Sequence, residues 1–399
     1  MFGKDIDMAD FASMKDGMND GMKIGLVTLS NYNYGSVLQC YATQKYLKKY
    51  GCDCVLVEKE SGKNRRLAQL KTLSSMMLAL FQHPKETKAI AEQFLSQRAK
   101  SLNLTGESIG QIQQFRQKHI KKEAYSYREL KKTAATEEYD YFFSGSDQVW
   151  NGARVSGYDM FFLRFAPKEK RVAWAPSFGG DRIAKYNQKR YANFISQYHM
   201  LSAREESGGE LIQALTGKKV PILCDPVMLL SADAWRENYR ENTSMPSEEP
   251  CIVLFFIDEI SEAALVFADT MSQEKKMKCI SFGYDYPQYA RLSAYRHCDG
   301  SPYDFLYSLD HASVVITDSF HATAFSAIFH TDFYVFSRSY THGQNQSARL
   351  THFLGEIGAK DRFDSDRMLP ELNFSMVDAF IAKKRNEAYD YLKQCLGES

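Results

Sequence analysis

The chain has 399 residues, 44% of them hydrophobic, which is enough for two domains of ordinary size with buried cores. Its 50 Lys and Arg residues balance its 49 Asp and Glu residues, so the net charge is +1. No overall field therefore attracts nucleic acid or an anionic membrane. Because no apolar run approaches the roughly 20 residues that cross a bilayer, and no signal peptide is present, we expect a cytoplasmic protein.

The cysteine pattern argues against a metal or disulfide framework. The eight Cys residues are scattered, and no pair of CxxC motifs occurs. No cluster of carboxylates takes the place of such motifs. We therefore expect no metal site.

The folded pattern begins at Met22. Residues 1–21 are polar and rich in Met, and we expect them to form a disordered extension. An apolar run over residues 23–29, a helical pattern after Gly35 and a second apolar run over 52–57 then follow. This order predicts a β-α-β unit with parallel strands.

Residues 60–138 differ in composition from their flanks. They are rich in Lys, Gln, Leu and Met and have few β-branched runs, so we predict amphipathic helices that form an insertion in the first domain. The basic side chains of this insertion are most simply a solvated face. The alternative is that they hold a charged acceptor.

The alternation of strands and helices resumes after the insertion. Strands are predicted over residues 139–144, 171–175, 200–203 and 220–224, with helices over 181–198 and 209–216. The following polar segment contains Pro246 and Pro250, so we place a linker at 233–250. Residues 22–232 would then form the N-terminal domain.

Residues 251–399 repeat the same pattern and end in a long helix. Strands are predicted over 251–257, 279–283, 313–317 and 333–336, and helices over 261–273, 303–309, 322–329 and 375–396. Two α/β halves of this kind predict two Rossmann-like parallel sheets that face each other across a cleft.

Ligands of open parallel sheets bind beyond the carboxyl ends of the strands, so the turns after the strands are the candidate sites. The first such turn contains Asn33 and Gly35. Gly35 allows the backbone to approach a ligand closely, and the free N–H groups of the following helix favour an anion. The alternative is that Gly35 only makes a tight β-α turn.

A second turn places Ser146, Asp147, Gln148, Trp150 and Asn151 after an apolar strand. A turn with a helix cap explains Ser146 and Asp147. It does not explain the other three residues together, so this loop is a candidate binding surface.

In a third turn, Arg204 directly follows a short strand. There its planar guanidinium is positioned to hold a phosphate or a carboxylate. The alternative is a structural contact with Glu205 or Glu206.

The fourth turn runs from Thr317 to His321. Ser319 can cap the helix, which places His321 in its first turn, where the helix dipole and a bound dianion act on the imidazole in opposite directions. Such a His suits proton donation near neutral pH, and a structural His is the alternative. Asp318, Ser319 and His321 lie too close together in sequence for a hydrolase triad.

Taken together, these turns resemble the polysaccharide pyruvyl transferase family. The resemblance rests on residues 33–39 (NYGSVLQ), 139–140 (YD), 144–151 (SGSDQVWN), 177–179 (SFG), 202–205 (SARE), 225–226 (DP) and 317–321 (TDSFH). Residues 347–350 (SARL) resemble a late arginine segment of the family, with one more residue than expected between Asn345 and Arg349. Trp174-Ala175-Pro176 departs from the small residues expected before Ser177.

The resemblance implies a GT-B-like fold, similar to that of the two-domain glycosyltransferases. It implies transfer of pyruvate from phosphoenolpyruvate, as co-substrate and without a cofactor, to two hydroxyls of a sugar, which forms a ketal. The acceptor would be a cell-surface glycan or its lipid-linked precursor. The reaction would take place in the cytoplasm or at the inner face of the membrane. In the second case the protein would contact the membrane peripherally.

The resemblance also implies roles for the residues of the four turns. His321 would be the general acid, and Arg204 would clamp the carboxylate or phosphate of the donor. The other donor-binding residues would be Ser319, Phe320, Ala322, Arg349 and Gly35. The acceptor-binding residues would be Asn33, Ser146, Asp147, Gln148, Trp150 and Asn151. Trp150 would stack on a sugar ring, and packing in the core is the alternative for it.

Two other functions remain open on sequence grounds. A glycosyltransferase that uses a nucleotide sugar needs the same helix N-termini for phosphates, so the fold does not exclude it. A non-catalytic binding protein on the same fold is the other alternative, although the presence of both His321 and Arg204 argues against it.

Overall fold

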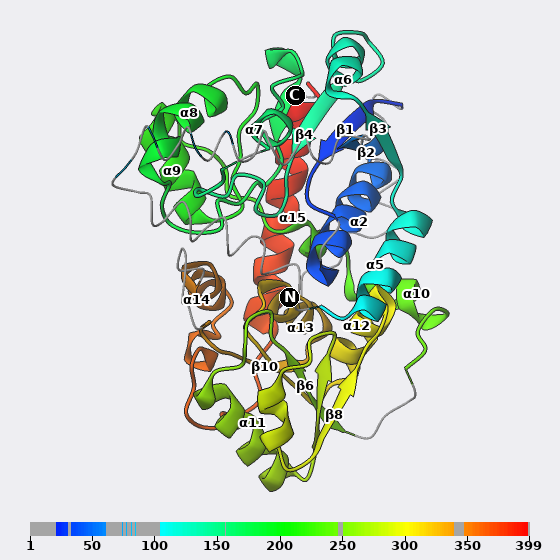
Figure 1. The fold of residues 1–399 in the computed structure, drawn as a ribbon, viewed down its shortest axis with the longest axis vertical. Helices are drawn as coiled ribbons and strands as arrows, with labels where there is room; N and C mark the ends of the chain where they lie inside the picture. The colour runs from blue at the N-terminus through cyan, green and yellow to red at the C-terminus, as the bar shows by residue number, and fades with distance from the viewer. Residues whose placement is uncertain are drawn as a thin grey trace.

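The computed structural model describes residues 21–30, 33–60, 104–155, 157–245, 250–338 and 347–397, with Ser74, Met77, Phe81 and Pro84 as isolated positions. The expected extension over residues 1–21 lies almost wholly outside these ranges, and so does most of the expected insertion before residue 104. Figure 1 shows two α/β halves, one above the other, with the last helix running along both. The predicted fold class is confirmed.

The first half is built on a five-stranded sheet in the order β3-β2-β1-β4-β5. Every pairing in it is parallel. Ile24 in the central strand pairs with Cys54 on one side and Tyr141 on the other. The strands are β1 (Lys23–Val27), β2 (Asp53–Lys59), β3 (Lys122–Tyr125), β4 (Tyr141–Ser144) and β5 (Arg171–Ala173).

The helices of this half are α2 (Tyr34–Lys49), α5 (Gly106–His119), α6 (Tyr127–Ala134), α7 (Tyr158–Phe161), α8 (Lys185–Ile195) and α9 (Glu206–Thr216). The expected all-helical insertion is wrong in its described part, because strand β3 lies between α5 and α6. β3 is an edge strand whose side chains are only partly buried, so it lacks an apolar run. The strands predicted over 200–203 and 220–224 form only single bridges, Val172 to Met200 and Ala203 to Ile222.

The second half repeats the architecture with a sheet in the order β10-β9-β6-β7-β8, again parallel throughout. Its strands are β6 (Cys251–Phe255), β7 (Lys278–Phe282), β8 (Tyr295–Cys298), β9 (Val314–Thr317) and β10 (Asp332–Val335). Its helices are α11 (Glu262–Lys275), α12 (Pro302–His311), α13 (Phe320–Phe329), α14 (Ser347–Glu356) and α15 (Ser375–Cys395). β8 was not predicted because its residues, Tyr-Arg-His-Cys, give a partly exposed edge strand.

The expected linker begins as a packed helix. Helix α10 (Ala232–Arg240) occupies the first half of residues 233–250, and Trp235 on it is fully buried. The Trp235 ring contacts Tyr41 of α2 at 5.7 Å and Phe325 of α13 at 5.1 Å between ring centroids. Trp235 and Tyr239 stand one helical turn apart and bury the same face of α10. The linker prediction rested on the prolines and the polar residues of this segment, and so it missed the helix. Residues 246–249 lie outside the described residues.

Helix α15 returns from the second half to the first (Figure 1). Arg385 donates hydrogen bonds to the carbonyl oxygens of Met228 and Leu230. Further along, the Tyr391 hydroxyl donates to the carbonyl oxygen of Ala173 in β5 at 2.9 Å. One hydrophobic core consequently includes residues of both sheets. None of the helices in the described ranges is both long and apolar enough to cross a bilayer.

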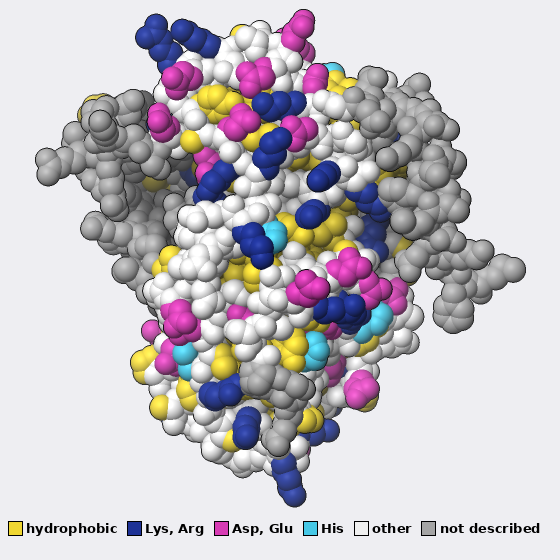
Figure 2. All heavy atoms as spheres, turned by 90° about the vertical axis from the view of Figure 1, so that its right-hand side faces the viewer, with side chains coloured by type: hydrophobic (Ala, Val, Ile, Leu, Met, Phe, Trp, Pro, Cys, Tyr) yellow, Lys and Arg dark blue, Asp and Glu magenta, His cyan; other side chains and the backbone are white. Residues whose placement is uncertain are grey.

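Figure 2 shows the face that carries α5 and α10, where basic and acidic side chains are interspersed. Two lysines of the expected insertion have local partners there. Lys118 donates to the side-chain oxygen of Asn242 at 2.9 Å, and Lys121 pairs with Asp53 at 2.7 Å. These contacts favour the interpretation of a solvated face over that of a grip on a charged acceptor.

Candidate active site

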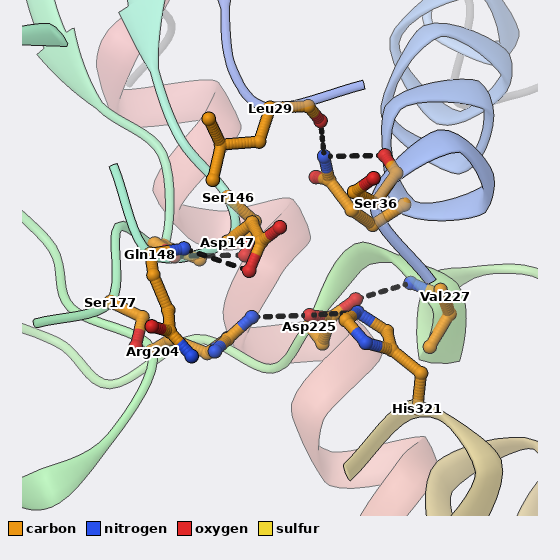
Figure 3. Close-up of polar contacts among 12 residues, drawn as sticks. Leu29, Ser36, Ser146, Asp147, Gln148, Ser177, Arg204, Asp225, Val227 and His321 are labelled. Carbon is orange, nitrogen blue, oxygen red and sulfur yellow. Dashed lines mark hydrogen bonds and ion pairs between the residues drawn. The ribbon is translucent and has the colours of Figure 1, made fainter. Parts of the chain in front are cut away.

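His321 projects from the start of α13 toward the first half of the chain. Strand β9 ends at Thr317, and the Ser319 hydroxyl caps the helix by accepting a hydrogen bond from the Ala322 N–H at 3.4 Å. The His321 side chain is 12% exposed, and its Nε2 lies 3.4 Å from Oδ2 of Asp225 (Figure 3). A local strand-turn-helix pattern thus delivers an imidazole to a carboxylate of the other half.

Asp225 connects the polar groups of this site. Its Oδ2 accepts a hydrogen bond from Nη1 of Arg204 at 2.7 Å, and its Oδ1 accepts from the Val227 N–H at 3.1 Å. Burial alone would raise the pKa of Asp225, but His321, Arg204 and the Val227 N–H together hold that pKa well below its ordinary value. The fully buried side chain is therefore ionised. Sequence reasoning did not place Asp225 in the site, although residues 225–226 are one of the stretches that carry the family resemblance.

Arg204 is buried and only partly satisfied. Its Nε donates to Oε1 of Glu205 at 3.1 Å and its Nη1 to Asp225, so the structural contact considered as the alternative exists. Burial lowers the pKa of Arg204, but the charges of Glu205, Asp225 and Asp147 raise it above its ordinary value. Its Nη2 is buried and finds no hydrogen-bond acceptor within the described part of the chain. The Nη2 amino group of a charged guanidinium is thus left to donate to a ligand.

The Phe320 ring contacts Arg204 and also a second guanidinium, that of Arg349 in α14. The Cζ atoms of Arg204 and Arg349 lie 5.2 Å and 5.0 Å from the centroid of the Phe320 ring. Burial and the positive charge of Arg204 lower the pKa of Arg349 to about 10, and its Nε also lacks an acceptor among the residues described. The adjacent cavity, about 40 Å³, holds little more than one water molecule. Two under-satisfied cations beside one ring favour the binding of an anion.

Gly35 meets His321 from the opposite half. A Cβ atom at Gly35 would lie 2.2 Å from Nδ1 of His321, so only glycine fits this contact. Asn33 does not reach a ligand with its side-chain oxygen, because that oxygen caps α2 by accepting from the Ser36 N–H at 2.7 Å. That oxygen fixes the start of α2 beside the site, and the expectation that Asn33 binds the acceptor stays a prediction.

The loop that follows β4 contributes less than expected. Ser146 is fully buried and donates to the carbonyl oxygen of Ala175 at 3.0 Å, so it does not face an acceptor. Asp147 has a positive φ of 57°. Its negative charge favours the charged forms of Arg204 and Arg349, although the pKa of Arg349 is lowered overall. Gln148 and Asn151 are partly exposed, and the Asn151 amide donates to Oε1 of Gln148 at 3.3 Å.

Trp150 belongs to the core, which favours the packing alternative over stacking on a sugar. Its side chain is fully buried, its ring stacks on Phe162 at 5.4 Å, and its indole N–H donates to the carbonyl oxygen of Phe161 at 3.2 Å. The apolar neighbours come from segments that lie later in the sequence. A sequence window around Trp150 therefore does not reveal its burial.

The start of α13 is closed by its cap. The Ser319 hydroxyl accepts from the Ala322 N–H, so that N–H is occupied, whereas the proton of the hydroxyl is not used by this bond. Both residues are buried, and their assignment as phosphate ligands stays a prediction. The Phe320 ring contacts both guanidiniums. Across the described ranges, no three His, Cys, Asp or Glu side chains are grouped so that they could hold a metal ion.

Comparisons with known proteins identify a family. The model of a family described as polysaccharide pyruvyl transferase matches residues 33–340. No curated protein matches the sequence. Among solved structures, the UDP-GlcNAc 2-epimerase from Neisseria meningitidis bound to UDP-GlcNAc aligns with a TM-score of 0.47 and 10% identity over 95% of each chain. The N-terminal domain of trehalose-6-phosphate phosphatase from Candida albicans aligns with a TM-score of 0.49 and 8% identity, over 96% of this chain and 98% of that one.

Proposed function

Because the chain belongs to the polysaccharide pyruvyl transferase family, we propose that it transfers pyruvate from phosphoenolpyruvate to two hydroxyls of a sugar, forming a ketal. The observation that supports this proposal most directly is the cluster of His321, Asp225, Arg204 and Arg349. It combines a proton donor with the buried guanidinium of Arg204 and the half-buried one of Arg349, each with a buried nitrogen that lacks an acceptor in the described residues. An anion with an acid-labile double bond suits such a cluster.

The reaction makes definite demands on the site. C3 of the enol must gain a proton, which gives C2 oxocarbenium character. A sugar hydroxyl then attacks C2, phosphate leaves, and the second hydroxyl closes the ketal while both hydroxyl protons are released. His321 acts as the general acid, either toward C3 or toward the departing phosphate. Acid catalysis of this kind is worth roughly 10²–10⁴-fold in rate.

Arg204 and Arg349 hold the donor. Phosphoenolpyruvate carries a carboxylate and a phosphate, and the site offers Nη2 of Arg204 and Nε of Arg349 as unused donors in a buried setting. Charge-assisted hydrogen bonds in such a setting are stronger than neutral ones. Because the present cavity admits little more than one water molecule, the surrounding side chains must move apart when the donor binds.

The acceptor sugar enters opposite the donor. Gln148 and Asn151 are partly exposed, and their amide groups suit the hydroxyls of a sugar. The acceptor is a cell-surface glycan or its lipid-linked precursor, reached in the cytoplasm or at the inner face of the membrane. In this scheme the protein's own side chains do the chemistry, with phosphoenolpyruvate as co-substrate and no cofactor.

The test is turnover. The protein is incubated with phosphoenolpyruvate and a panel of free and lipid-linked sugars, and phosphate release and the mass of the product are measured. We expect release of phosphate that depends on the acceptor, with a product heavier by a pyruvyl ketal. Stabilisation against heat by a uridine diphosphate sugar, but not by phosphoenolpyruvate, would instead identify a glycosyltransferase.

A further inference from the structure

We propose that Asp225 is a positioning residue that fixes the tautomer of His321, so that Nδ1 is the nitrogen that exchanges the catalytic proton. Asp225 also joins this acid to the donor clamp at Arg204. The part of the proposal that concerns turnover rests on the function proposed above. The part that concerns the imidazole does not.

The contacts of one oxygen atom carry the inference. Oδ2 of Asp225 accepts from Nη1 of Arg204 at 2.7 Å and faces Nε2 of His321 at 3.4 Å. Oδ1 is occupied by the Val227 N–H, so the carboxylate cannot rotate away without losing a buried hydrogen bond. A nitrogen that faces a permanently ionised carboxylate keeps its proton. Nε2 makes no hydrogen bond within the described part of the chain, and Oδ2 of Asp225, 3.4 Å away, is the carboxylate oxygen that it faces. We infer that Nε2 carries the hydrogen of the neutral ring and that the lone pair is on Nδ1.

The other nitrogen, Nδ1, meets the opposite half at a residue without a side chain. Gly35 lies against Nδ1, and any Cβ there would lie 2.2 Å from that atom. Gly35 therefore brings neither a charge nor a competing side-chain hydrogen bond to Nδ1.

The charges near the ring link the acid to the donor. Oδ2 of Asp225 faces His321 and also accepts a hydrogen bond from Arg204. The charges of Glu205 and Asp147 act on Arg204 as well. The charge of Arg204 in turn acts on Arg349. One carboxylate thus connects the imidazole to the two guanidiniums that would hold the donor.

The test compares wild-type protein with Asp225→Asn, which keeps the shape and an acceptor for the Val227 N–H but removes the charge. Histidines are labelled with ¹⁵N, and the His321 signals are assigned by their absence in His321→Gln. We expect wild type to show the Nε2–H tautomer. We expect Asp225→Asn to mix the tautomers. Its kcat should fall by about 10²-fold or more.

A matched control is Asp332→Asn. Asp332 also pairs with an arginine, Arg362, at 2.6 Å, but it stands at the start of β10, at the edge of the sheet away from the ligand-binding strand ends. This variant should lose stability without any change at His321. If the control behaves so and Asp225→Asn leaves the tautomer of His321 unchanged, Asp225 is merely structural and the proposal is overturned.

Two further outcomes are informative. If Asp225→Asn does not fold, Asp225→Glu keeps the charge with a longer side chain, and it should keep the Nε2–H tautomer. Loss of that tautomer in folded Asp225→Glu counts against the proposal. Because the imidazole is observed without turnover, a wild-type protein that forms no ketal contradicts the proposed function and leaves the result on Asp225 standing.

Discussion

Gly35 and His321 are in direct contact across the two halves of the molecule: a Cβ on Gly35 would lie 2.2 Å from Nδ1 of His321. The contact is enforced by Tyr34, whose ring stacks on Phe305 of the second half at 4.9 Å and whose hydroxyl donates to the carbonyl oxygen of Gly300 at 2.8 Å. The first residue of α2 is therefore packed against the second half. The backbone at Gly35 is held in place, so a larger residue there cannot move away from His321.

Gly35→Ala should displace the His321 ring and lower kcat by at least about 10²-fold, because acid catalysis depends on the placement of the imidazole. The matched control is Gly110→Ala in α5, where a Cβ would meet nothing within 4 Å. That variant should gain about 1 kcal/mol of stability from helix propensity and keep its activity. Equal kinetics for the two variants would show that the contact at Gly35 does not matter for catalysis.

His321→Gln should lower kcat by roughly 10²–10⁴-fold and change the KM for the donor little, because the ring acts as an acid and the two guanidiniums supply the binding. Steady-state kinetics with both substrates varied measure the two constants separately. Near-normal kcat at saturating donor and acceptor would rule out the acid role.

Arg349→Gln should raise the KM for phosphoenolpyruvate by roughly 10- to 100-fold, the worth of one hydrogen bond to a charged group. Arg291→Gln serves as control, because Arg291 forms an exposed ion pair with Glu262 that contributes little. An unchanged donor affinity in Arg349→Gln would remove Arg349 from the donor site.

Asp225 should also contribute to stability in a pH-dependent way. Its pKa in the folded protein lies below the ordinary carboxyl value of 3.8, so its contribution is complete above that pH and is lost as the pH falls toward its folded pKa. The difference in unfolding free energy between wild type and Asp225→Asn should therefore be largest near neutral pH and shrink in acid. Denaturant unfolding over this range measures it, and a difference independent of pH would contradict the ionised state.

Trp150→Phe should leave the KM for the acceptor unchanged, because the indole is buried against Phe162 and does not face a ligand. Trp150→Ala should cost about 3–5 kcal/mol of stability through the cavity that it creates. Thermal unfolding and acceptor kinetics are the two measurements. A large rise in acceptor KM for a stably folded Trp150→Phe would restore the stacking hypothesis.

Local patterns made part of this structure predictable. The turn at Thr317 to His321 could be read because a strand end, a serine cap and a helix start are adjacent in sequence. The buried strands were predictable because each is a short apolar run of adjacent residues. The edge strands β3 and β8 could not, because their polar, partly exposed residues lack an apolar run.

The partnership at the centre of the site was not predictable from local patterns. Asp225 binds Arg204, which lies 21 positions away in sequence, and faces His321 of the other half. Nothing near Asp225 in the sequence signals that one oxygen serves both partners. The burial of Trp150 was not predictable either. Its neighbours in sequence are polar and suggested an exposed loop, whereas residues distant in sequence cover the ring.

The return of α15 has a consequence for how the protein is made. Tyr391 closes over Ala173 and Trp174 of the first half, although more than two hundred residues separate them along the chain. During synthesis, the apolar surface around Trp174 that Tyr391 covers therefore stays exposed to solvent until the final helix has left the ribosome. A growing chain must be shielded over that interval, and a stop codon placed before α15 should yield an insoluble product even though both sheets have been translated in full.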